Sequence, residues 1–221
     1  NTLVIPANVV DTLIEYDRYG VVQPSLAESW EHNEDYTQWT FHIRQGVKWV
    51  DDAGAEVADV TAHDWVTAAH YILETATDGT DKNGNPAKLD ADGNVIEEVP
   101  AVAPEDIGVK ATDDYTLVFT LDAPCSYFLS MLCWSAFMPV NGEFLAQCGD
   151  TFGTNADTLL YCGPFRLSSF KPQEERVMSK NASYWDKDNV FIDEIRETYN
   201  AEASTLSTTM YLQGEVDYAE I

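Results

Sequence analysis

Positively charged residues are scarce in this sequence. It contains 12 Lys and Arg against 38 Asp and Glu in 221 residues, which gives a formal net charge of −26. A surface of this charge repels phosphate backbones and anionic lipids, and no basic stripe is present. The composition therefore argues against nucleic acid and anionic membrane as direct partners. It favours a well-solvated surface, with attraction of a cationic ligand as the alternative interpretation.

Long apolar runs are also missing. No stretch approaches the ~20 apolar residues that are needed to cross a bilayer. The first residues show no charged region followed by an apolar one, which is the pattern of a signal peptide. We therefore expect any export signal or lipid anchor to lie outside these residues.

Motifs for catalysis and metal binding are missing as well. There is no GxSxG elbow and no glycine-rich phosphate loop, which argues against a nucleotide enzyme. His63 and His70 are seven residues apart on one expected helix, whereas a helical zinc pair needs a spacing of four. Asp and Asn runs within 81–94 resemble calcium-loop spacing but lack its sixth-position glycine and later glutamate. We expect no catalytic residue, no metal site and no cofactor.

The four cysteines fall in one short region without a close CxxC pair: Cys125, Cys133, Cys148 and Cys162. Zinc ribbons and thioredoxin-like sites use such pairs, so neither is predicted. One or two disulfides, as in exported proteins, and buried free thiols are both compatible with the sequence.

What the sequence does have is enough apolar content for a core: 45% hydrophobic and 12% aromatic residues. Trp39, Phe41 and Ile43 alternate with polar residues, the period of a strand with one buried face. Thr61 with Asp64 resembles a capping box ahead of the apolar helical stripe Trp65, Ala69, Ile72 and Ala76. The expected elements are helices over Val9–Tyr16, Ala62–Thr75, Tyr127–Leu132, Gly142–Gln147 and Thr205–Gln213, and strands over Trp39–Ile43, Val47–Trp49, Ile107–Ala111, Tyr115–Leu121, Phe165–Phe170 and Arg176–Ser179. Mixed strands and helices without a regular repeat predict a mixed α/β (α+β) class.

One segment is too long and too polar for an ordinary connection. Residues 77–106 are rich in Asp, Gly, Asn and Pro, and we interpret them as an insertion or flexible excursion. Asp92-Gly93-Asn94 within it predicts a hairpin turn.

Several phrases, in one order along the chain, resemble a known family. They are Pro24–Glu31 (PSLAESWE), Trp39–Trp49 (WTFHIRQGVKW), Thr61–Val66 (TAHDWV), Gly108–Thr116, Pro139–Val140, Cys162–Phe165 (CGPF), Asn181–Trp185 (NASYW) and Gly214–Asp217 (GEVD). Together they resemble the extracytoplasmic oligopeptide- and dipeptide-binding proteins of ABC transporters, solute-binding family 5. The sequence departs from that pattern in an enlarged turn at Asp51–Asp59 and in the excursion at 77–106.

The resemblance implies a type II periplasmic-binding-protein-like fold, of which this chain would supply the first lobe with its smaller subdomain and not the second lobe. Residues 1–35 would form a first-lobe segment and 36–160 the smaller subdomain, with the excursion inserted. Residues 161–221 would return to the first lobe and end near the hinge.

The resemblance also implies a function. Such a protein binds peptides in the cleft between its lobes and delivers them to ABC permease subunits. It would act as a monomer in the periplasm or as a lipoprotein on the outer face of the cytoplasmic membrane. A metal chelate or an oligosaccharide is the alternative solute, and a secreted hydrolase or adhesion module is a further alternative.

The candidate ligand-binding residues come from two segments. By resemblance, Thr2, Leu3 and Val4 offer extended backbone to the peptide, although a plain sheet strand is the competing interpretation. Trp39 and Trp65 lie on patterned core faces, whereas Trp134 lies in a segment of small residues beside Phe137. Trp134 and Phe137 are therefore the aromatic candidates.

Overall fold

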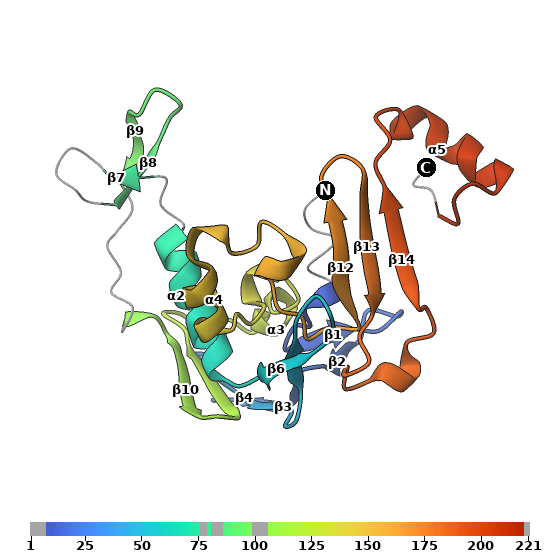
Figure 1. Ribbon diagram of the computed structural model, residues 1–221. Helices are drawn as coiled ribbons and strands as arrows, with labels where there is room; N and C mark the ends of the chain where they lie inside the picture. The colour runs from blue at the N-terminus through green and yellow to red at the C-terminus, as the bar shows by residue number, and fades with distance from the viewer. Residues whose placement is uncertain (1–7, 76–78, 81–85, 99–105, 219–221) are drawn as a thin grey trace.

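The chain has a mixed α/β fold in which two sheets lie on either side of a group of short helices (Figure 1). The structure is a computed structural model, and it describes residues 8–75, 79–80, 86–98 and 106–218. The order of elements follows no βαβ repeat, in agreement with the predicted class.

The larger sheet has four antiparallel strands in the order β10-β11-β4-β3. Their bounds are β3 Ala27–His32, β4 Gln38–Ile43, β10 Val109–Asp113 and β11 Thr116–Thr120. Along β4, Trp39, Phe41 and Ile43 are buried while His42 is exposed, which confirms the period-two prediction. The register places Phe41 opposite Leu117 on β11, so both inner strands contribute apolar side chains to the same face.

Aromatic side chains fill the core against this sheet. The ring of Phe119 lies 5.7 Å from Phe41 and 5.2 Å from Phe128, both in edge-on geometry. Helix α2, His63–Thr75, adds buried Trp65, and α3, Phe128–Met131, adds Phe128. Edge-to-face contacts of this kind add to the free energy gained by burial.

Two small hairpins link this core to the rest of the chain: β1 Ile14–Tyr16 with β2 Val22–Pro24, and β5 Lys48–Val50 with β6 Glu56–Asp59. The β5–β6 turn is the enlarged turn noted in the sequence. Arg166 of β12 donates a hydrogen bond to its Asp52 carbonyl, and the Ser183 hydroxyl donates to Glu56 at 2.8 Å. The turn therefore fastens the aromatic core to the smaller sheet.

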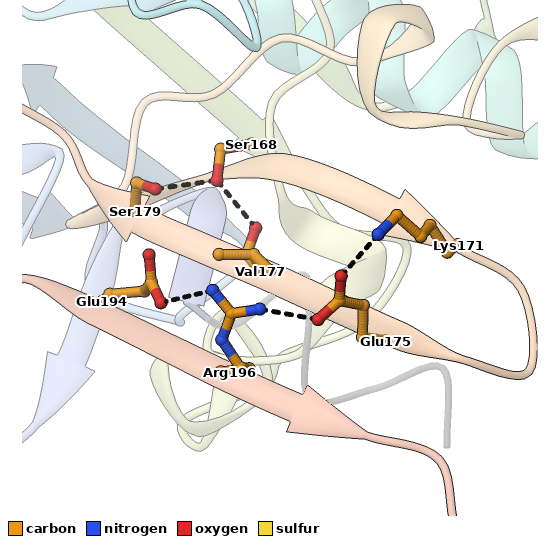
Figure 2. Close-up of polar contacts among 7 residues, drawn as sticks. All are labelled: Ser168, Lys171, Glu175, Val177, Ser179, Glu194 and Arg196. Atoms are coloured by element: carbon orange, nitrogen blue, oxygen red, sulfur yellow. Dashed lines mark hydrogen bonds and ion pairs between the residues drawn. The ribbon is translucent and has the colours of Figure 1, made fainter.

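The smaller sheet has three antiparallel strands, β12 Phe165–Lys171, β13 Glu175–Lys180 and β14 Glu194–Thr198. Phe165, Leu167 and Met178 are buried in a second apolar cluster. Across the strands runs a polar ladder, drawn in Figure 2, in which Glu175 accepts from Lys171 at 2.7 Å and from Arg196 at 2.6 Å. Arg196 continues to Glu194 at 2.9 Å.

The excursion forms a small sheet of its own, β7 Gly79–Thr80, β8 Pro86–Leu89 and β9 Val95–Glu98, that projects away from the core (Figure 1). The predicted turn is confirmed, because Gly93 has φ of 82° and the Asp90 side chain accepts from the Asp92 and Asn94 N–H groups. Its three strands were not predicted.

The remaining elements are short. They are α4 Gly142–Cys148, α5 Ala203–Gln213, and single 3₁₀ turns at Ser135–Phe137, Gly149–Thr151, Ala156–Thr158 and Lys187–Asn189. Helix α5 ends at Gly214, whose φ of 74° is the left-handed conformation that glycine adopts without strain. The helices predicted near residues 62–75, 142–147 and 205–213 are thus confirmed, with ends that shift by one or two residues.

One helix prediction was wrong. Residues 14–16 form strand β1, in which Ile14 pairs with Pro24. The apolar spacing of Val9, Val10, Leu13 and Ile14 fits a helix, but Leu13 and Ile14 are buried in the aromatic core through a short antiparallel pair. Tertiary packing outweighs local periodicity in so short a segment.

Candidate functional site

The predicted peptide-facing residues Thr2, Leu3 and Val4 lie outside the described residues. The segment that follows them is fixed by backbone hydrogen bonds. The Val9 carbonyl accepts from the N–H groups of Cys162 at 3.1 Å and Gly163 at 2.9 Å. A Cβ on Gly163 would lie 2.8 Å from the Val9 carbonyl carbon, so the close approach requires glycine.

A buried carboxylate lies two residues further on. Asp11 accepts hydrogen bonds from the Trp185 indole N–H at 3.0 Å and from the Ser25 hydroxyl at 3.5 Å. The guanidinium of Arg44 stacks on the Trp185 ring with its carbon 3.9 Å from the ring centroid. Asp11 therefore ties the N-terminal segment to Ser25, which follows β2, and to Trp185, which precedes the 3₁₀ turn at 187–189 and stacks on Arg44 at the end of β4.

The environment of Asp11 favours its neutral form. Burial raises the pKa of this carboxyl to about 6, and the nearby charge of Glu15 acts in the same direction. The hydrogen bonds from Trp185, Tyr184 and Ser25 lower the pKa but do not offset the loss of hydration.

A second buried carboxylate has a structural role. Asp64 accepts from the Thr61 N–H at 2.9 Å and from the Trp49 indole N–H at 3.0 Å. The first bond is the carboxylate half of the predicted capping box. Burial raises the pKa of Asp64 to about 6 as well. His63 is exposed and lies 3.3 Å from Asp114, in agreement with a surface role.

The two aromatic candidates have different environments. Trp134 precedes the 3₁₀ turn at Ser135–Phe137 and is 72% exposed. Phe137 is half-buried, with its ring 6.4 Å from Phe119 and 6.1 Å from Phe128. Its carbonyl accepts from the Trp65 indole N–H at 2.9 Å. Trp134 is thus available to a ligand, whereas Phe137 belongs mainly to the core.

One face of Phe137 nevertheless borders a hollow, which we call the apolar pocket. It has a volume of about 250 Å³ and is lined only by apolar residues: Trp65, Ala68, Ala69, Ile72, Val109, Phe119, Ala136 and Phe137. The exposure of Ile72, which the helical stripe predicts to be buried, is explained because this side chain borders the hollow. Spacing along α2 predicts the apolar stripe, but a hollow between α2 and the sheet depends on packing.

Among the described residues, no group of three or more His, Cys, Asp or Glu side chains is placed to hold a metal ion. All four cysteines are free, and burial raises the pKa of the Cys162 thiol well above its usual value. Within the same residues, no helix is both long and apolar enough to span a membrane.

Comparison with solved structures places this fold among solute-binding proteins. The chain superimposes with a TM-score of 0.77 and 30% identity on the substrate-binding domain of an oligopeptide ABC transporter from Bacillus anthracis, over 96% of this chain and 39% of that one. It also matches Listeria monocytogenes OppA bound to peptide, with a TM-score of 0.74 and 28% identity over 96% of this chain and 40% of the other.

Sequence comparison gives the same assignment. Residues 21–221 match the model of bacterial extracellular solute-binding proteins, family 5 middle. The chain is 35% identical over 207 residues to the oligopeptide-binding protein SarA of Streptococcus gordonii, covering 88% of this chain and 29% of SarA. The chain therefore belongs to family 5 of the bacterial extracellular solute-binding proteins. It spans about a third of the length of the curated relatives that it matches.

Sequence reasoning missed Asp11 and the apolar pocket. The resemblance includes Trp185 within NASYW, but nothing in a linear pattern pairs it with a carboxylate 174 residues away.

Proposed function

We propose that this chain is part of the substrate-binding component of an ABC importer that binds oligopeptides in a cleft between two lobes and delivers them to permease subunits. It would supply the first lobe, in residues 1–35 and 161–221, with the smaller subdomain in residues 36–160. The observation that carries the proposal is membership of family 5 together with a fold shared with a peptide-bound relative. The protein acts outside the cytoplasm as a monomer, in the periplasm or anchored as a lipoprotein.

Peptide backbone is held by residues 2–4 in this proposal. An extended segment binds peptide main chain by strand-like hydrogen bonds, which is independent of side-chain identity. The hydrogen bonds to the Val9 carbonyl and the burial of Asp11 support this role, because they hold in place the part of the chain that leads away from residues 2–4. Thr2, Leu3 and Val4 remain the residues assigned to it.

Trp134 contributes aromatic surface to peptide side chains, and Phe137 anchors the turn that follows it. An indole that is 72% exposed offers a large apolar face at little entropic cost. Phe137 is packed against Phe119 and Phe128, and it follows Trp134 within one 3₁₀ turn. The Phe137 N–H donates to the Trp134 carbonyl at 2.9 Å, so the packed Phe137 ring anchors the turn that presents Trp134.

The test is native mass spectrometry of the longer protein that contains this sequence, incubated with a mixture of free peptides at low micromolar concentration. We expect peptide adducts on the longer protein, and weak adducts or none on residues 1–221 alone, because one wall of the cleft is then missing. Failure of the longer protein to bind any peptide would contradict the substrate and leave the fold assignment intact.

A matched pair of variants tests the aromatic site. Trp134→Ala in the longer protein should reduce affinity several-fold, since stacking surface is lost. Tyr19→Ala removes another strongly exposed aromatic ring, at the turn that joins β1 to β2, and should leave affinity unchanged. Equal effects of the two variants would remove Trp134 from the site.

A further inference from the structure

A second hollow lies between helix α2 and strand β10, and we call it the α2–β10 groove. It has a volume of about 300 Å³ and is lined by His63, Val66, His70, Ile107, Val109, Lys110 and Ala111. It shares Val109 with the apolar pocket, so the two hollows adjoin. None of its lining residues belongs to the proposed peptide site.

The groove opens on the edge of the larger sheet. Strand β10 is the outermost strand of the order β10-β11-β4-β3. Val109, Lys110 and Ala111 are consecutive, and alternate side chains of a strand point to opposite faces. Three consecutive residues can border one hollow only if it runs along the backbone edge of the strand.

One backbone donor at this edge, the Ala111 N–H, faces away from β11. The Thr120 N–H donates to the Gly108 carbonyl at 2.6 Å, which makes Gly108 and Thr120 a hydrogen-bonded pair of the β10–β11 ladder. Because such pairs alternate along an antiparallel ladder, Lys110 also faces β11 and Ala111 faces outward. Ala111 pairs with Leu117 just before a shift in register, and the Val109 N–H, which also faces outward, donates to the Ile107 carbonyl at 2.8 Å.

The groove also carries unpaired positive charge in an acidic protein. Lys110 has no ion pair or hydrogen bond within the part of the chain that the structure describes, whereas the other described lysines contact a carboxylate or a carbonyl oxygen. His70 lies across the groove on α2, and His63 is already paired with Asp114. Among the described residues that line the groove, the unpaired cation is therefore Lys110, next to Ala111 on the edge strand.

We propose that the α2–β10 groove binds an extended polypeptide segment, which adds as a fifth strand at the edge of β10. Backbone groups of the segment pair with Ala111, an apolar side chain lies against Val66 and Val109, and a carboxylate pairs with Lys110. A second copy of this chain does not fit, because edge-to-edge pairing would bring two Lys110 residues together and oppose two net charges of −26.

The first experiment is an NMR titration of the ¹⁵N-labelled chain with a blocked hexapeptide, Val-Thr-Val-Glu-Val-Thr, at up to millimolar concentration. We expect shift changes at residues 107–111 and 63–70, and slower hydrogen exchange of the Ala111 amide. The same peptide with Lys in place of Glu should bind about fivefold more weakly, since an attractive exposed pair becomes repulsive. Equal binding of both peptides would contradict the assigned charge.

Two variants test whether Lys110 and the Ala111 N–H take part in peptide binding, or whether Lys110 only protects the strand edge from aggregation. Lys110→Glu should reverse the preference between the two peptides, whereas Lys187→Glu, on a surface 3₁₀ turn, should not. Ala111→Pro removes the outward donor, and proline is tolerated on edge strands, so the fold should survive while binding is lost. Retained peptide binding in a folded Ala111→Pro chain would overturn the strand-addition geometry.

The remaining outcomes are also decisive. Absence of shifts at residues 107–111 would overturn the proposal, and Lys110 would then serve only to protect the edge from aggregation. If shifts appear only after residues 79–104 are replaced by a short Gly-Ser linker, the excursion itself is the occupant and the external partner is wrong. The proposed function is tested separately, by mass spectrometry of the longer protein with free peptides. Failure of either test therefore leaves the other proposal unaffected.

Discussion

The two sheets of this chain are stabilised in different ways. The four-stranded sheet packs Trp39, Phe41 and Phe119 against α2 and α3 in one aromatic core. The three-stranded sheet buries a smaller cluster that includes Leu167 and Met178, and it carries the charged ladder drawn in Figure 2. The contrast suggests that the first sheet depends mainly on burial, while the second combines modest burial with exposed ion pairs. Four predictions test this contrast.

The largest effect is expected in the aromatic core. Phe41→Ala should reduce the free energy of unfolding by about 3–5 kcal/mol, because a fully buried ring is lost and a cavity remains. Urea denaturation followed by fluorescence measures it. His42→Ala, the next residue of β4 and exposed, is the control, with an expected change within about 0.5 kcal/mol. Similar values for both would show that the core is not where stability resides.

A smaller loss is expected in the three-stranded sheet. Leu167→Ala should cost about 3 kcal/mol or less in the same assay, because its cluster is smaller and can relax more easily. Leu167→Met keeps the volume and should cost about 1 kcal/mol. A loss for Leu167→Ala that exceeds the loss for Phe41→Ala would reverse the ranking of the two sheets.

The junction of the two sheets should show a pH effect through Asp11. The pKa of this carboxyl is raised from 3.8 to about 6 in the folded chain, so the native state binds the proton more tightly than the unfolded state. The stability contribution of Asp11 therefore falls as pH rises from about 4 through 6. Asp11→Asn keeps an oxygen for Trp185 without the charge, and it should be about 2 kcal/mol more stable than the parent at pH 7.5.

Thermal melts of both proteins between pH 4 and 7.5 check this prediction. The difference between them should shrink toward pH 4, where Asp11 is protonated. An Asn variant that is less stable than the parent at pH 7.5 would mean that the charged form of Asp11 is the favoured one.

The smallest effect is expected in the ladder of Figure 2. Glu175→Gln removes the charge that joins Lys171 and Arg196, and it should lower Tm by about 1 °C because exposed ion pairs contribute little. Melts in 0.05 M and 1 M NaCl should show that salt removes the difference, since screening acts over a few ångströms at high ionic strength. A large loss that persists in high salt would assign the ladder a structural role equal to that of the cluster.

Much of this fold follows from local patterns. The alternation of Trp39, Phe41 and Ile43, the capping residues ahead of α2, and the hairpin turn around Gly93 each express a short-range rule, and each prediction is confirmed. The helix expected over Val9–Tyr16 failed because four apolar residues in a short segment fit a helix or a buried strand equally well. The pairing of Ile14 with Pro24 decides between them.

The candidate site was less predictable. Trp134 and Phe137 were indistinguishable as sequence neighbours, yet one is exposed and the other packs against Phe119 and Phe128. Asp11 carried no motif of its own. Its significance arises from Trp185 and Ser25, which chain folding brings to it from two other elements.

The sequence by itself determined the acidic surface, the family framework and the buried face of β4, because these depend on composition and on residues close together along the chain. Only the tertiary structure decided the buried Asp11 contacts, the free thiols and the groove beside β10. These features depend on which distant segments meet, and the free energy of burial and of long-range pairing governs that choice.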